Sequence, residues 1–301
     1  MRTARQTSVP RRLLSATGVA STVVLTALAG GCGGDSGSSS GGLSLVHSGT
    51  ITWCADISAP PLSYYDEDQK PVGAEVELGD AMAKSMGLRS EWKNIAFSGI
   101  IPALQGHQCD AILSQLYIKP ERLEVVDFVP YMYAGNTVLV PQGNPEGING
   151  LEDLCGHKVA TETGTTSVDY LDQTSVTCKD AGEPEVAISK FAHDSEAQQQ
   201  LKLGLVDAYA TTVETAGYAV TTNPDLYETI GEPFGRITCG IATTKDATEL
   251  HDALQKALTA VRDDGTYDDI LADWSLTGDN LPADDAAEAT ASVAASVSPS
   301  S

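Results

Sequence analysis

The sequence predicts an α/β fold built mostly from parallel strands, with helices on both faces of the sheet. Short apolar runs alternate with amphipathic stretches of helical length along most of the chain. Strands that alternate with helices in this way form parallel sheets, because each helix carries the chain back to the same edge. The 301 residues, of which 42% are hydrophobic, suffice for two packed domains of ordinary size.

The expected helices carry the clearest pattern. In the segment 75–86, Leu78 and Met82 are four residues apart, and Gly87 follows as a stop signal. In the segment 247–262, leucines recur every four residues on one stripe. In chain order we expect a strand at 51–56, helices at 75–86 and 98–104, strands at 110–114, 138–140 and 158–161, a helix after 166, a strand at 186–191, a helix at 195–203, a strand at 206–211, and helices at 214–220, 247–262 and 267–274.

The first 31 residues are predicted to be a lipoprotein signal peptide. A basic segment, 2–12, precedes an apolar one, 13–29, and small residues lead up to Cys32. This order resembles bacterial lipoprotein signals, in which the Cys is lipidated and becomes the first residue of the mature protein. A plain secretory signal and a short membrane anchor are the alternatives. The Gly- and Ser-rich segment 32–46 would then be a flexible tether.

The chain is strongly acidic, with 41 Asp and Glu against 18 Lys and Arg and a net charge of −23 at pH 7. This charge argues against a nucleic-acid partner and against a basic surface that adheres to anionic lipid. Membrane contact is therefore expected through the lipid anchor alone. The segment 279–301 is acidic and rich in Ala and Ser, and we expect it to be a disordered tail.

Metal and cofactor chemistry has no signal in the sequence. The six Cys have no CxxC or CxxH spacing, and the five His are scattered without an HExxH motif. We therefore expect no metal and no cofactor. Exported cysteines tend to form disulfides, and lipidation of Cys32 would leave an odd number of them.

A series of short motifs between 52 and 274 carries a resemblance through its order and spacing. The motifs are 71–78 (PVGAEVEL), 101–104 (IPAL), 109–112 (CDAI), 119–122 (KPER), 126–128 (VDF), 151–154 (LEDL), 158–160 (KVA), 164–166 (GTT), 206–208 (VDA) and 264–267 (DGTY). With them the chain resembles the extracellular solute-binding proteins of family 3, the polar-amino-acid receptors of ABC importers.

The resemblance implies a two-lobed type II periplasmic-binding-protein fold with the ligand cleft between the lobes. Each lobe would be a mostly parallel sheet flanked by helices. Lobe 1 is expected to comprise 47–136 and 240–278, and lobe 2 to comprise 137–239. The hinge, around which such lobes close on a ligand, is expected near 135–137 and 238–240.

The implied function is that of a lipid-anchored receptor on the extracytoplasmic face of the cell membrane. It would bind a small polar solute, an amino acid or related zwitterion, as a monomer, and deliver it to an ABC permease. The chain is thus not expected to be an enzyme. Two alternatives remain, a cyclohexadienyl-dehydratase-like enzyme on the same fold and a solute sensor.

The resemblance also implies a clamp for the ligand's carboxylate. In the family, the Arg at the position of Arg122 takes this group, and a planar guanidinium suits a carboxylate because it offers two parallel hydrogen bonds. Gly164, Thr165 and Thr166 would open a helix on the other lobe, whose free N–H groups favour an anion. Ser114 and Gln115 are expected to add polar contacts near the clamp.

Three positions depart from the family pattern. Tyr117 replaces a Thr or Ser, Ala59 replaces an aromatic lid, and Thr212 replaces the Asp that receives the α-ammonium. Without that Asp, another carboxylate has to offset the cost of burying an ammonium, and we favour Glu162 over Glu214. The expected wall residues are Phe97 and Tyr117, and the identity of the ligand stays open.

Two disulfides are expected once the chain is placed on this fold. Cys54 ends the first strand and Cys109 begins the strand expected beside it. Cys155 and Cys178 flank one strand–helix unit of lobe 2. Cys239 is expected to be free and buried.

Overall fold

A computed structural model describes residues 42–286 and 288. The expected signal peptide, the lipidated Cys32 and most of the tether lie outside the described residues, as do 287 and 289–301. Within the described part of the chain, no helix combines the length and the apolar character that crossing a membrane requires.

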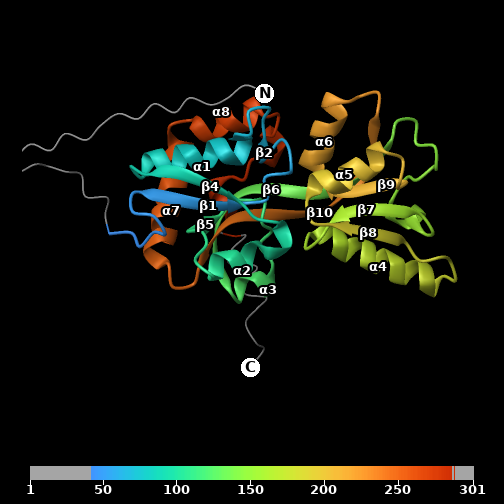
Figure 1. The fold of residues 1–301 in the computed structure, drawn as a ribbon, viewed down its shortest axis with the longest axis horizontal. Helices are drawn as coiled ribbons and strands as arrows, with labels where there is room; N and C mark the ends of the chain where they lie inside the picture. Colours follow the sequence, from blue (N-terminus) through green and yellow to red (C-terminus); the bar gives the residue numbers. More distant parts are fainter. Residues whose placement is uncertain (1–41, 287, 289–301) are drawn as a thin grey trace, which may run out of the picture. The chain divides into compact units, whose positions relative to one another are not determined.

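The described chain forms an eight-stranded sheet with the strand order β4-β1-β5-β10-β6-β9-β7-β8 (Figure 1). Two parallel blocks, one for each lobe, flank two long strands: β1 pairs in parallel with β4 and β5, and β7 pairs in parallel with β8 and β9. The strands β6 and β10 are antiparallel to each other and run through both lobes. The strands are β1 (Thr50–Ala55), β4 (Arg89–Asn94), β5 (Ala111–Ile112), β6 (Val126–Pro141), β7 (Lys158–Glu162), β8 (Ala187–Phe191), β9 (Ala208–Thr212) and β10 (Tyr227–Thr244), with a separate hairpin of β2 (Tyr64–Tyr65) and β3 (Pro71–Val72).

Helices cover both faces of the sheet in each lobe, as predicted (Figure 1). Successive strand residues supply opposite faces, so Trp53 packs with one hydrophobic cluster of lobe 1 and Cys54 with the other. The helices of lobe 1 are α1 (Ala74–Ser85), α7 (Thr248–Asp263) and α8 (Thr266–Asp273) on one face, and α2 (Ile100–Gln105) and α3 (Pro120–Leu123) on the other. Those of lobe 2 are α4 (Thr166–Asp180) on one face, and α5 (Asp194–Lys202) and α6 (Val213–Thr222) on the other.

Both predicted disulfides are present. Cys54 and Cys109 are bonded with their Cα atoms 5.7 Å apart, and Cys155 and Cys178 with theirs 5.5 Å apart. Cys239 is free and buried, as expected. The first bridge joins the penultimate residue of β1 to the second residue before β5.

The second crossing between the lobes lies earlier than predicted. Phe234 packs with a core cluster of lobe 2, whereas Ile237 and Cys239 pack with lobe 1, so the chain crosses near Gly235 rather than at 238–240. The pairing of β10 with β6 is irregular on both sides of Phe234, and Gly235 has a φ of +63°. A glycine there lets the strand bend, because other residues rarely adopt such a φ. The hinge motion itself stays a prediction.

The described residues at the start of the predicted tail, 279–286, are structured rather than disordered. Asn280 forms an isolated bridge with Met132, the Leu281 side chain is fully buried, and residues 283–286 are helical. Burying one leucine contributes about 1.5–3 kcal/mol, which offsets part of the entropy cost of ordering residues that composition alone assigns to a tail.

Candidate functional site

A cavity between the two lobes lies at the carboxyl ends of the parallel strands. It measures about 580 Å³ with its open mouth included. Strands β1, β5, β7 and β9 all end beside it, as the general rule for open α/β sheets requires. The predicted site residues that line it are Phe97, Ser114, Gln115, Tyr117, Arg122, Glu162, Thr165, Thr166 and Thr212.

Arg122 lies on the short helix α3 of lobe 1 and reaches across to lobe 2. Its Nη1 donates to the carbonyl oxygen of Tyr117 at 3.0 Å, and its Nη2 donates to that of Gly164 at 3.4 Å. The guanidinium also lies 5.7 Å from the centre of the Phe97 ring. Burial lowers the pKa of Arg122, but a guanidinium stays charged at any working pH. Since it has five N–H donors, it retains donors for a ligand.

The segment from Gly164 to Thr166 forms the start of α4 on the opposite wall. Gly164 lies just outside the cavity lining with a φ of +88°, and a Cβ there would come within 3.0 Å of the Ser98 Cα in lobe 1. Thr165 is the N-cap residue, and its hydroxyl donates to the Glu162 carbonyl at 2.8 Å. The Thr166 hydroxyl is buried without a partner and lines the cavity. The lobes therefore touch at the place where an anion can meet the helix start.

The charged side chains on the cavity wall are mostly acidic. Of the described residues that line it, Arg122 is the only base, whereas Asp56, Glu75, Glu162 and Asp194 are acids. Burial, followed by the negative charges of Asp56 and Asp194, raises the pKa of Glu162 well above its usual value. Its Oε1 has no hydrogen-bond partner. Burial likewise raises the pKa of Asp194 to about 6.

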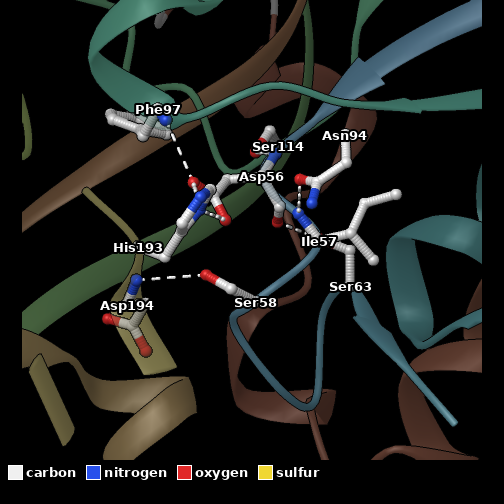
Figure 2. A network of polar contacts seen from close by, with 9 residues as sticks. All are labelled: Asp56, Ile57, Ser58, Ser63, Asn94, Phe97, Ser114, His193 and Asp194. Carbon is white, nitrogen blue, oxygen red and sulfur yellow. Dashed lines mark hydrogen bonds and ion pairs between the residues drawn. The ribbon is translucent and has the colours of Figure 1, made fainter. Parts of the chain in front are cut away.

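Sequence reasoning missed Asp56, Ser58, His193 and Asp194, which meet across the lobe interface (Figure 2). His193 Nδ1 lies 3.0 Å from an Asp56 carboxylate oxygen, and the Asp194 backbone N–H donates to the Ser58 hydroxyl at 3.0 Å. Asp56 also accepts from the Phe97 N–H at 3.0 Å. Asp56 directly follows β1, and Asp194 is the third residue after β8. Polar residues just beyond strand ends were therefore a usable signal.

Gln115 joins the lobes on another side of the cavity. Its backbone N–H donates to Glu75 Oε1 at 2.6 Å, and its side-chain amide donates to Glu214 Oε2 at 2.7 Å. Burial raises the pKa of both Glu75 and Glu214 to about 7. Glu214 lies outside the cavity lining, whereas Glu162 is part of it, and the role of Glu162 stays a prediction.

The structure shows the surroundings of each of the three residues that depart from the family pattern. Thr212 caps α6, where its hydroxyl accepts from the Thr215 N–H at 3.3 Å. The Tyr117 hydroxyl donates to the Gly135 carbonyl at 3.3 Å, so this side chain packs against the lobe crossing. Ala59 lines the cavity and leaves it without an aromatic cover at that position. In the described part of the chain, no group of three or more His, Cys, Asp or Glu is arranged to hold a metal ion.

Comparisons with known proteins agree with this geometry. Residues 51–277 match the model for bacterial extracellular solute-binding proteins, family 3. The L-cystine-binding protein TcyJ of Escherichia coli (strain K12) is 29% identical over 227 residues, which cover 75% of this chain and 82% of that protein. The ABC transporter arginine-binding protein 1 of the same strain is 29% identical over 229 residues, which cover 74% and 90%.

Two solved structures are similar across the same region. An ancestral arginine-binding protein bound to arginine shares 39% identity with a TM-score of 0.69, covering 75% of this chain and 98% of that one. The ancestral amino acid-binding protein AncCDT-1, a precursor of cyclohexadienyl dehydratase, shares 32% identity with a TM-score of 0.67, covering 75% and 95%.

Proposed function

Because the chain belongs to the bacterial extracellular solute-binding proteins, family 3, we propose that it is a lipid-anchored receptor for a zwitterionic amino acid. It would present its solute to an ABC permease at the extracytoplasmic face of the membrane. Its relatives are amino-acid-binding proteins of ABC transporters, which supports the solute-binding role.

The observation that carries the proposal is the position of Arg122 opposite the start of α4. The two elements belong to different lobes and line one cavity. A carboxylate between them would receive the fork of a guanidinium from one side and helix N–H groups from the other. Such a group would therefore hold the two lobes together, as a receptor that closes on its solute requires.

The acids of the cavity support a solute that also carries positive charge. Four carboxyl groups line the wall, and Arg122, the single base there, hydrogen-bonds to backbone carbonyls rather than to any of them. A buried carboxylate needs a counter-charge or a proton. Among the amino acids named for the relatives, arginine supplies that charge, so L-arginine is the first solute to test.

The test is calorimetric titration of L-arginine into the wild-type protein and into Arg122→Ala and Arg122→Lys. Removing one partner of a buried charge pair costs about 2–5 kcal/mol, so Arg122→Ala should weaken binding by about 30-fold or more. Arg122→Lys should recover only part of this loss, because an ammonium cannot present two parallel N–H groups. Arg89→Ala is the control, since Arg89 is exposed outside the cavity. Equal affinity in Arg122→Ala would refute the clamp.

The anchor is tested separately. In cells that express the full chain, the wild-type protein should partition with membranes, and Cys32→Ala should abolish lipid attachment as seen by mass spectrometry. Unmodified Cys32 in the purified wild-type protein would remove the lipid anchor from the proposal.

A second candidate function is a dehydratase. The resemblance to a precursor of cyclohexadienyl dehydratase favours it, as does the raised pKa of Glu162, which makes a proton donor of an acid inside the cavity. Incubation with prephenate and arogenate tests it. Turnover that disappears in Glu162→Gln would establish the enzyme, and unchanged substrate would exclude it.

A further inference from the structure

Three carboxyl groups from different elements gather in one part of the cavity. Asp56 follows β1 of lobe 1, Glu162 ends β7 of lobe 2, and Asp194 begins α5 of lobe 2. All three are buried, at 3%, 6% and 5% exposure. We call Asp56, Glu162 and Asp194 the carboxyl cluster.

The carboxyl cluster is only partly satisfied by the protein. Asp56 contacts His193 and accepts from the Phe97 N–H, while Asp194 Oδ1 accepts from the Tyr209 hydroxyl and from the Thr211 hydroxyl at 3.1 Å. Glu162 Oε1 and Asp194 Oδ2 are buried without any partner. A buried polar atom without a partner costs free energy unless a ligand or water binds it.

Resting on the proposed function, we infer that the carboxyl cluster is a cation subsite that gives up a proton when the positively charged side chain of the solute, rather than its α-ammonium, enters. Three neighbouring buried carboxyl groups cannot all be ionised with a single imidazole beside them, so the cluster holds at least one proton when it is empty. A guanidinium or ammonium supplies the missing charge and hydrogen-bond donors at once. The displaced proton passes to the solvent.

The pKa shifts of the carboxyl cluster agree with the release of a proton when a cation binds. Burial and the charges of Asp56 and Asp194 raise the pKa of Glu162, and burial raises that of Asp194 to about 6. A positive charge beside these groups acts in the opposite direction and lowers both pKa values. Each proton released makes binding about tenfold weaker for each pH unit that the solution is lowered.

The other charged and titratable groups around the cluster come from three elements. His193, at the start of α5, faces Asp56, and the Tyr209 hydroxyl of β9 faces Asp194. Arg122 of α3 is directed to the Gly164 carbonyl. Of these groups, the His193 imidazole contacts the cluster directly and can itself carry a proton. His193→Asn therefore separates a proton released by the imidazole from one released by the carboxyl groups.

The experiment compares L-arginine with L-citrulline, which has the same shape but a neutral side chain. Calorimetry of both in phosphate and in Tris at pH 7 counts the protons released on binding, because Tris takes up protons with a much larger heat than phosphate. We expect arginine to bind at least tenfold more tightly than citrulline and to release close to one proton, whereas citrulline should release none. The affinity for arginine should fall by up to tenfold between pH 8 and pH 7.

Variants decide whether the cluster is responsible. Glu162→Gln should abolish the proton release and reduce the ratio of arginine to citrulline affinity, while the exposed Glu196→Gln on α5 is the matched control and should change neither. Proton release that persists in Glu162→Gln but vanishes in His193→Asn would overturn the inference, as would arginine binding without proton release.

The outcomes for Arg122→Ala separate the inference from the proposed function. If arginine binds with proton release and Arg122→Ala binds it equally well, the carboxylate clamp fails and the cation subsite stands. If Arg122→Ala loses affinity and no proton is released in the wild-type protein, the receptor function stands and the subsite fails. If arginine does not bind at all, both fail.

Discussion

Replacing Glu75 by Gln should stabilise the ligand-free protein at neutral and alkaline pH. Glu75 is 2% exposed, and its Oε1 accepts from the Gln115 N–H and from the Tyr131 hydroxyl. Both contacts need an acceptor, which the oxygen of a glutamine amide supplies equally well. The substitution therefore removes the charge and keeps the shape and both hydrogen bonds.

The magnitude follows from the raised pKa. Burial moves the pKa of Glu75 from 4.5 to about 7, so the folded protein binds this proton more tightly than the unfolded chain does. The stability that the protonated form contributes is complete below pH 4.5 and is lost as the pH rises towards 7. A shift of this size corresponds to about 3 kcal/mol. Gln cannot ionise, so the gain over wild type should be about 1 kcal/mol at pH 5 and about 3 kcal/mol at pH 8.

The assay is urea unfolding of both proteins at pH 5, 6, 7 and 8, with the free energy of unfolding obtained by linear extrapolation. Glu77→Gln is the control, because Glu77 is exposed on the same helix and its replacement should give no pH-dependent difference. A Glu75→Gln variant that is less stable than wild type to the same extent at every pH would refute the reasoning. That result would mean that the carboxylate is stabilised as an ion by its two donors.

Two further predictions concern the stability of the fold. Converting Cys155 and Cys178 to Ser opens a bridge between positions 23 apart in the sequence, which should lower the free energy of unfolding by about 3 kcal/mol, and an unchanged urea midpoint would show that the bridge does not form. Leu281→Ala should cost about 2–5 kcal/mol in the same assay if the segment after α8 packs as described. A loss below 1 kcal/mol would indicate that Leu281 does not pack as described and belongs to the disordered tail predicted from the composition.

The sequence predicted the helices better than the long strands. The apolar stripe of α7 is buried at Leu250, Leu254, Leu258 and Val261, as its four-residue spacing requires. β10 was missed entirely, and only the segment 138–140 of β6 was expected. β6 is buried along almost its whole length, and β10 changes from mostly exposed to buried, so neither strand shows the two-residue alternation of a half-buried strand.

Site residues that belong to a recognisable motif could be predicted from the sequence. Site residues that come together only because the two lobes pack against each other could not. Arg122 and the segment 164–166 belong to such motifs, and the structure brings both to the cavity. His193 and Asp194 carry no motif, and they meet Asp56 only because the lobes bring together positions about 137 residues apart. Contacts between lobes of this kind depend on the packing of whole sheets, which local pattern does not encode.

The acidity of the cavity and the contact between the lobes are physically coupled. Lobe 1 contributes Asp56 and Glu75 to this region, and lobe 2 contributes Glu162, Asp194 and Glu214. The predicted closure of the lobes would therefore bring like charges together and remove water from them, and both effects favour protonation. A cationic solute would replace the proton as the neutralising charge, but only when the lobes are closed around it. Since a ligand shifts a conformational equilibrium by its difference in affinity for the two states, the same carboxyl groups that select the charge of the solute would also drive closure upon it.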